Sequence, residues 1–512
     1  MSVNIFKKRH PAVANIFASV KSLKKILLVP IDYAKSTHKV LFINGDGDQC
    51  RAPFDVHNTN AGFELLLQSI KRTCKKRRIA AKHVIIGGEG LPCFARNFIH
   101  AVDNHFLVLN IHAKEAKEMR QTEQASTDKL DLVGIAKSML HGSGKPIGKQ
   151  RFMQNNICND DDISLDAPVY EDLFADQAPL QILTRHRAKL VLDRTGCSNR
   201  IHTLIDQLFP GFLDAKSPLS AFSKASVELM KAPNFSAQQV AKAKPRNLSK
   251  NLKEWGTHQP EESALMLIEM AKDSLSSAPS ISPNLQIALA SQVIHYEGLK
   301  KSISHIEAHL HASLVSSPAS LLLSLPGIGV VLAAGIYAEL GSSLALRPLT
   351  ELCSYSGIIP RVKQSGGPDK PARAGKVRKP ANRILKNYLV RAAMKMQAFG
   401  PPHLQEAYQQ LKANGQHADF IIARRLLRSF KYMMIHQTIY LPPVLRHLSQ
   451  ADPALLTNHL NDTREKIAAK WQRTTQAEEA MSSDHPLGRW WETVKSGVIH
   501  LRSHEFEDLT IH

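Results

Sequence analysis

The sequence predicts a multi-domain protein in which an α/β domain precedes a helical coiled-coil middle and a mainly helical C-terminal domain. Its 512 residues are too many for one core. Apolar runs near the N-terminus alternate between strand and helix spacing, and two later segments repeat apolar residues every seven positions. The expected divisions are a basic extension (1–23), the α/β domain (24–141), loop insertions with coiled-coil helices (142–315), the C-terminal domain (316–440) and an unassigned tail (441–512).

The α/β domain contains three strands that we expect to be antiparallel, followed by alternating helices and strands. NGDGD at 44–48 is a hairpin signal between the second and third strands. In chain order the expected elements are strands at 26–32, 39–43 and 50–56, a helix at 60–75, a strand at 83–87, a helix at 92–102 and a strand at 106–111. This order is the one expected of a ribonuclease-H-like, RuvC-type nuclease fold.

Four acidic residues stand where such a domain could build a metal site. Asp32 ends the first strand, Glu89 follows the strand before 90, and Asp128 and Asp131 lie three apart at the start of an amphipathic helix. Carboxylates in these places offer hard oxygen ligands, which suit Mg²⁺ or Mn²⁺. Two ions held this way could stabilise the entering and leaving oxygens of a phosphodiester displacement. The alternative is that they are ordinary turn and helix-cap acids.

The charge of the chain points to a polyanionic partner. The formal net charge is +21 and the sequence pI is about 9.7, which favours binding to nucleic acid.

No run of eighteen apolar residues exists, so we expect no transmembrane helix. The six cysteines include no CxxC pair and the basic N-terminus has no clear cleavage site. These features favour a cytoplasmic protein.

Two heptad segments lie in the middle of the chain. The first carries Leu183, Leu190, Cys197 and Leu204, and the second carries Leu289, Tyr296, Ile303 and Leu310. Such seams pair within one chain as an antiparallel hairpin or between subunits as a coiled coil; a helix packed against its own domain is the remaining possibility. Residues 211–284 between them are rich in Ser, Lys and Pro and give no clear prediction.

The C-terminal domain opens on a glycine turn between apolar segments. LPGIG at 325–329 matches a helix-hairpin-helix turn, whose second helix can hold a phosphate at its N-terminus, although a glycine turn between core helices would look the same. A helix with one basic and one apolar face is expected at 420–440.

A strongly basic segment between these helices contains a serine beside two glycines. Residues 361–391 hold ten Lys or Arg and one acid, and Ser365 precedes Gly366 and Gly367. The expected nucleic-acid contacts are Arg361, Lys363, Arg373, Lys376, Arg378 and Lys379. Serine is a weak nucleophile that needs a base or a metal to activate it. Spacing alone favours a flexible basic loop with an incidental serine.

Three ordered blocks of the chain resemble the insertion-sequence 110 family of transposases. They are ID-x-x-K at 31–35 with TD-x-x-D-x-x-x-x-A at 127–136, then LDRTGCSNRIHTLIDQLFPGF at 192–212, and then LPGIGVVLAAGIYAELG with YSGIIPRVKQSGG at 325–367. In that family the four acids are a metal-binding tetrad on a RuvC-like fold. The resemblance therefore implies that Asp32, Glu89, Asp128 and Asp131 hold the metal and that Ser365 is the nucleophile.

The chain departs from the family pattern at three places. Pro30 stands where glycine is usual, Ser126 where lysine is common, and Gln364 where a second serine usually precedes the nucleophile. The last departure makes Ser356 the fallback candidate.

The resemblance implies a recombinase that cuts and rejoins double-stranded DNA of the element and its target through a phosphoserine link. It also implies a structured guide noncoding RNA and a homo-oligomer, either dimer or tetramer, in a prokaryotic cytoplasm. Three other functions stay open. They are a DNA invertase of the same architecture, a hydrolytic RuvC-like junction endonuclease, and a nucleic-acid-binding protein without catalysis.

Overall fold

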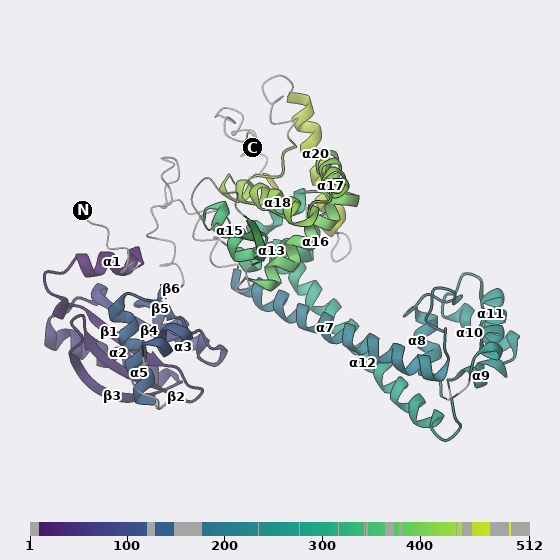
Figure 1. The fold of residues 1–512 in the computed structure, drawn as a ribbon, viewed down its shortest axis with the longest axis horizontal. Helices are drawn as coiled ribbons and strands as arrows, with labels where there is room; N and C mark the ends of the chain where they lie inside the picture. The colour runs from purple at the N-terminus through teal and green to yellow at the C-terminus, as the bar shows by residue number, and fades with distance from the viewer. Residues whose placement is uncertain are drawn as a thin grey trace. The chain divides into compact units, whose positions relative to one another are not determined.

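The fold divides into two compact units, residues 1–167 and 168–512 (Figure 1). The computed structural model describes residues 10–119, 128–147, 177–363, 373–377, 381–442, 453–471 and 491–492, apart from 234, 276, 316, 342–343, 345–346 and 437. None of the described helices is long and apolar enough to span a bilayer.

A six-stranded mixed sheet forms the centre of the first unit, in the order β3-β2-β1-β4-β5-β6. The strands are β1 (Leu27–Asp32), β2 (Thr37–Asn44), β3 (Gln49–His57), β4 (Val84–Glu89), β5 (Leu107–Ile111) and β6 (Lys145–Pro146). β1, β2 and β3 pair antiparallel, whereas β1, β4 and β5 are parallel. The predicted mixed α/β order is confirmed; β6 lies in the stretch expected to be a loop.

Helices cover both faces of this sheet. They are α1 (Pro11–Ala18), α2 (Asn60–Arg77), α3 (Arg96–Asp103), α4 (Ala113–Glu118) and α5 (Asp128–His141), with 3₁₀ turns at η1 (Leu23–Lys25), η2 (Ala81–His83) and η3 (Cys93–Ala95). Along β1, Leu27, Val29 and Ile31 pack with α2 and α3. Ile26 and Leu28 pack with α1, α4 and α5 on the other face, as the alternation of side chains along a strand requires.

The second unit is helical and contains two separate cores. Its helices are α7 (Gln177–Leu208), α8 (Lys224–Lys231), α9 (Ala237–Ala241), α10 (Pro245–Glu254), α11 (Pro260–Asp273), α12 (Ser282–Val315), η5 (Pro318–Ser324), α13 (Val330–Leu340), α15 (Leu349–Ser356), α16 (Arg383–Phe399), α17 (Pro402–Ala413), α18 (Ala418–Ile435) and α20 (Pro453–Trp471). A two-stranded hairpin, β7 (Pro360–Lys363) with β8 (Arg373–Val377), lies between α15 and α16.

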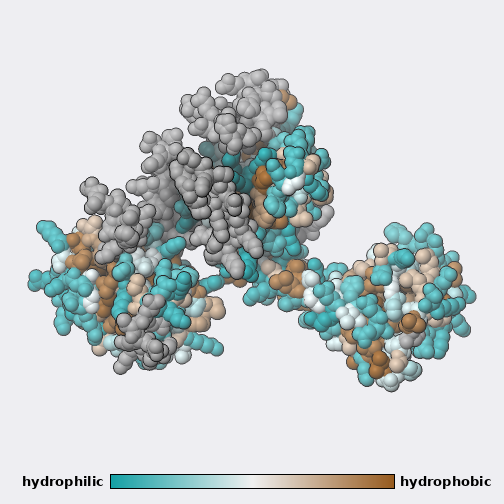
Figure 2. Space-filling view, in the orientation of Figure 1, coloured by the Kyte–Doolittle hydropathy of each residue, from teal (hydrophilic) through white to brown (hydrophobic). Residues whose placement is uncertain are grey.

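The two heptad segments pair with each other inside the chain. Arg187 forms an ion pair with Glu307, and Cys197 and Arg200 contact Gln292, so α7 and α12 run antiparallel side by side (Figure 1). One core surrounds the end of α7 and the start of α12, where α8–α11 pack. The described part of residues 211–284, whose structure was not predicted, therefore forms a small helical domain, whose surface mixes polar and apolar side chains (Figure 2).

The other core contains α13, α16 and α18 and includes the glycine turn. LPGIG joins η5 to α13, so the expected helix-hairpin-helix is wrong in one respect: a 3₁₀ helix precedes the turn. The hydroxyls of Ser320 and Ser324 donate to carbonyls three residues back, which favours this tighter helix. Gly327 has φ +86° and leaves room for Met396. The turn is thus a packing feature of the core.

Candidate active site

Two of the predicted acids end neighbouring parallel strands. The β1–β4 register pairs Ile31 with Gly88, so the next residues, Asp32 and Glu89, lie side by side at the carboxyl ends of their strands. Neighbouring strands lie about 4.8 Å apart. Asp32 alternates with Leu28 and Glu89 with Ile85, and both of these apolar residues pack on the α5 face. The two acids therefore belong to the same face of the sheet.

Helix α5 brings the other pair to the same end of the sheet. Leu140, near its C-terminus, lies beside Gly47 in the β2–β3 turn, and that turn adjoins the start of β1 because Asn44 pairs with Leu27. The helix therefore runs against β1, and its first turn lies toward the carboxyl ends of β1 and β4. Asp131 is half-buried there; the side chain of Asp128 lies outside the described residues. Three of the four predicted acids thus converge on one edge.

These donors suit a hard divalent cation in their chemistry. They are all carboxylates, and Asp32, Glu89 and Asp131 are each half-buried rather than fully exposed. Within the described residues, no three His, Cys, Asp or Glu side chains are grouped closely enough to hold a metal ion.

Tyr33 lies directly after Asp32 at this edge of the sheet, and its role was not predicted from the sequence. Its ring passes over Gly88, where any Cβ atom would overlap the ring. The buried His38 ring contacts Tyr33 edge-on at 5.7 Å between centroids, and its Nδ1 accepts from the Ala34 amide at 3.2 Å. Burial raises the pKa of the Tyr33 phenol, which therefore stays protonated at neutral pH. The paired glycines before Glu89 are the sequence feature that could have indicated this close packing.

The second predicted centre lies in the β7–β8 hairpin. Ser365 and the residues 364–372 around it lie outside the described residues, as do 378–380 with Arg378 and Lys379. The backbone register pairs Lys363 with Arg373. Arg361 lies on β7 and Lys376 on β8. Four of the six predicted contact residues are thus on the hairpin that carries the serine.

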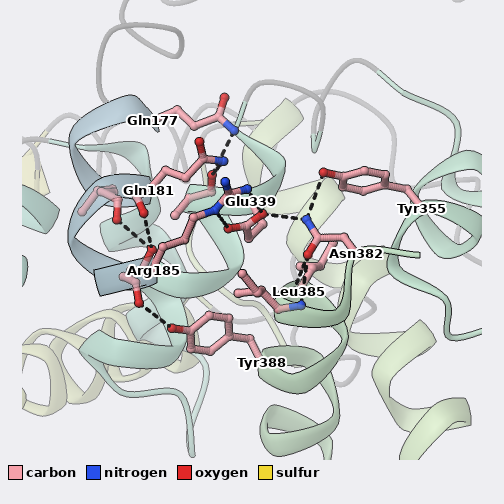
Figure 3. A network of polar contacts seen from close by, with 12 residues as sticks. Gln177, Gln181, Arg185, Glu339, Tyr355, Asn382, Leu385 and Tyr388 are labelled. Carbon is pink, nitrogen blue, oxygen red and sulfur yellow. Dashed lines mark hydrogen bonds and ion pairs between the residues drawn. The ribbon is translucent and has the colours of Figure 1, made fainter. Parts of the chain in front are cut away.

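A polar network around the buried Glu339 holds the base of this hairpin (Figure 3). Glu339 on α13 accepts from Arg185 Nε at 2.8 Å and Nη2 at 3.0 Å, and from Asn382 Nδ2 at 2.6 Å. Asn382 Nδ2 also donates to the Tyr355 hydroxyl at 2.9 Å, and the Asn382 amide donates to the Tyr355 carbonyl at 2.9 Å. The two ends of the segment 356–381 are therefore fastened together.

The same network anchors α7. Gln177 and Gln181 both donate to the carbonyl of Ala338, at 3.0 and 3.1 Å, one residue before the Glu339 that holds Arg185 (Figure 3). The three side chains recur every four residues, so they form one stripe of the helix. Contacts to Glu339 raise the pKa of Arg185 further above its ordinary value. The sequence offered no sign of this pairing across about 150 residues.

The fallback serine is structural in its setting. Ser356 is fully buried at the end of α15, and its hydroxyl donates to the Cys353 carbonyl at 3.1 Å. Gly357 follows with φ +69° and ends the helix. A nucleic-acid phosphate has no access to Ser356 in this conformation.

Comparison with known proteins identifies the class first. Residues 29–154 match a family model described as "Transposase", and residues 319–409 match one described as "Transposase IS116/IS110/IS902 family". A curated relative from Streptomyces coelicolor, "Insertion element IS110 uncharacterized 43.6 kDa protein", is 26% identical over 193 residues. That alignment covers 37% of this chain and 46% of the relative. Both family models describe transposases, and the chain spans about half the length of the curated relative.

Over these two segments the chain is similar to transposases of the IS110 family. The first match spans the unit with the six-stranded sheet and the second spans the segment from η5 to α17, which contains the β7–β8 hairpin.

Proposed function

We propose that this protein is a DNA transposase that cuts and rejoins the strands of an insertion element. The observation that carries the proposal is the convergence of Asp32, Glu89 and the first turn of α5 on one edge of a mixed sheet. The matches to transposase models at both chemical centres support it.

Asp32, Glu89, Asp128 and Asp131 would hold Mg²⁺ or Mn²⁺ at this edge. When bound, the ions supply positive charge that stabilises the oxygens entering and leaving phosphorus. The protein's own part is to hold the carboxylates of Asp32, Glu89 and Asp131 at one edge of the sheet. Tyr33 and the α5 packing position the strand ends and the helix turn that carry them.

Ser365 is the proposed nucleophile. Its hydroxyl oxygen forms a bond to the phosphorus of a DNA phosphodiester, the bond from phosphorus to one deoxyribose oxygen breaks, and the serine proton ends on that departing oxygen. A second strand's hydroxyl reverses the step, so the strand is rejoined without ATP because a phosphodiester bond is exchanged for another. The cations of β7 and β8 would bind the flanking phosphates.

The guide is proposed to be a structured noncoding RNA, and the active form a homodimer or homotetramer. Base pairing would then read the sequence of donor and target DNA, while the protein binds backbone. The +21 charge is compatible with DNA alone or with DNA and RNA together.

The proposal is tested by trapping the covalent intermediate. The full-length protein is expressed from a plasmid that also carries the DNA flanking its gene. It is then incubated with a labelled duplex spanning an element end, and the mixture is denatured with detergent. The parent should yield a protein–DNA adduct. Ser365→Ala should yield none while binding the duplex normally, and the matched Ser356→Ala should still form the adduct.

Three outcomes separate the alternatives. An adduct in Ser365→Ala places the nucleophile elsewhere. Strand cleavage without any adduct in the parent indicates the hydrolytic endonuclease. Products in which only a fixed chromosomal segment is reversed indicate the invertase. Sequencing the RNA that co-purifies with the protein tests the guide separately.

A further inference from the structure

A second cluster of cations lies on the first unit, away from the acids. It joins η1, the last turn of α2 and η2, three segments spread over residues 23–83. We name it the amino-end cationic surface, and its residues are Lys21, Lys24, Lys25, Lys75, Lys76, Arg77, Arg78 and Lys82. All are exposed except the half-buried Arg77. Eight positive charges therefore share one part of a small domain.

Direct contacts bring the segments together. Lys25 Nζ donates to the carbonyl of Arg77 at 3.0 Å, which joins η1 to the end of α2. Ser19 Oγ lies 3.3 Å from His83 Nε2, which joins the end of α1 to η2. The clustering is therefore a property of the fold and not of one basic run in the sequence.

This surface lies at the opposite end of the sheet from the acids. η1 leads directly into β1 and η2 into β4, at the residues Leu27 and Val84 that pair with each other. Asp32 ends β1 five residues later, so the strand alone separates the two sites by about 17 Å. The cluster cannot be part of the carboxylate site.

Helix capping does not account for the cluster. Cations in the last turn of α2 do favour the helix dipole. Arg78, however, occupies the left-handed position after the helix, with φ 54° and ψ 52°, where glycine is the favoured residue. A bulky cation therefore stands where the backbone prefers no side chain, which is a pattern associated with function.

Neutralisation by the protein itself does not account for it either. Asp46 and Asp48, in the nearby β2–β3 turn, are exposed, and Asp48 accepts from Asn44 at 2.9 Å. Across the described part of the chain, no acid forms an ion pair with any residue of the amino-end cationic surface. The positive charge is left for a partner.

We propose that the amino-end cationic surface is a second nucleic-acid site, which binds the phosphodiester backbone of a duplex apart from the reacting strands. Its ligand is recognised by the charge of the phosphates, which exposed Lys and Arg side chains neutralise. The backbone belongs to DNA or to a folded RNA. The proposal stands without the metal site or the serine, since it requires binding only.

The test compares two full-length variants that lose the same charge. The first variant changes four residues of the amino-end cationic surface to Gln: Lys24, Lys75, Lys76 and Arg78. The second variant changes four cations of the small helical domain to Gln: Lys242, Lys244, Arg246 and Lys250. Affinity for a 30-base-pair DNA duplex and a 30-base-pair RNA duplex is measured by anisotropy from about 50 to 300 mM salt in EDTA. Each phosphate contact contributes roughly 0.9 to the slope of log affinity against log salt.

In the first variant, the magnitude of the slope of log affinity against log salt should fall by about three for at least one duplex. In the second variant it should fall by less than one. Loss with DNA only or RNA only names the source of the backbone. Equal loss in both variants means that net charge alone acts, and an unchanged slope in the first variant means that the surface faces solvent. Either result overturns the proposal.

A single substitution separates binding from stability. Arg78→Gly removes one cation and relieves the left-handed backbone, so the melting temperature should hold or rise while the salt slope falls by about one. A variant that melts higher and binds like the parent would assign Arg78 no part in binding.

Discussion

Removing either partner of the Arg185–Glu339 pair should destabilise the second unit, but by unequal amounts. Glu339 has no exposed side-chain surface, whereas the Arg185 side chain is 42% exposed. An unpaired carboxylate would remain in the interior after Arg185→Met. An unpaired guanidinium could rehydrate after Glu339→Gln. The arginine substitution should therefore cost more.

The magnitudes follow from the burial of the charge left behind. Arg185→Met leaves Glu339 with the side-chain amide of Asn382 as its remaining donor. Breaking a buried ion pair in this way costs about 3–5 kcal/mol. Glu339→Gln keeps volume and one acceptor oxygen, so about 1–2 kcal/mol is expected. The double variant should be less destabilised than the sum of the two, by at least about 1.5 kcal/mol.

Tryptophan fluorescence during guanidinium unfolding measures this selectively. All four tryptophans, Trp255, Trp471, Trp490 and Trp491, belong to the second unit, and Trp491 is buried in the core that contains α13 and α16. A loss of about 4 kcal/mol should lower the midpoint by roughly 1 M. Arg187→Met, which removes the neighbouring pair with Glu307 on α12, is the control, because Glu307 is about one-third exposed.

Equal losses for the two single variants, or additive losses in the double variant, would refute the reasoning. Additivity would mean that the pair carries no coupling energy and that Asn382 alone satisfies Glu339. A control loss as large as that of Arg185→Met would show that burial of the carboxylate does not set the cost.

Two further predictions concern the first unit. Asp32→Ala or Asp131→Ala should abolish strand cleavage while leaving duplex binding within about twofold, because phosphate contacts come mainly from Lys and Arg; cleavage at the parental rate in EDTA would contradict this. Burial raises the pKa of Asp103 to about 6, opposed by His100. The folded state therefore holds this proton more tightly, so the unit should lose stability as pH rises from about 4 to 6, and Asp103→Asn should flatten that dependence in calorimetry.

The first unit was largely predictable from sequence because its signals are local. Buried strands such as Leu27–Asp32 and Val84–Glu89 are continuous apolar runs, and NGDGD marks the hairpin by its turn residues. Asp32 and Glu89 could be placed because each ends such a run. Even their common face follows from the alternation of side chains, once the strands are known to be parallel neighbours.

The second unit was less predictable because its determinants are distant in sequence. Helices α8–α11 span between five and fourteen residues, and short helices with mixed polarity carry weak periodicity. Glu339 meets Arg185 across 154 positions, and no local pattern announces that contact. The heptad spacing predicted that the two helices pair. Only the structure shows that α7 pairs with α12 of the same chain and not with another subunit's helix.

The two glycines before Glu89 connect sequence, packing and the proposed chemistry. Gly87 and Gly88 are adjacent on β4, so they belong to opposite faces of the sheet. A Cβ at Gly87 would lie 2.5 Å from Met139 Sδ on α5, and a Cβ at Gly88 would overlap Tyr33. The missing side chain at 87 thus sets how closely α5, which carries Asp131, approaches β4. The missing side chain at 88 sets how closely the residue after Asp32 approaches β4. Both close approaches lie directly before Glu89, so the glycine pair sets how closely α5 and Tyr33 pack on the strand that ends in Glu89.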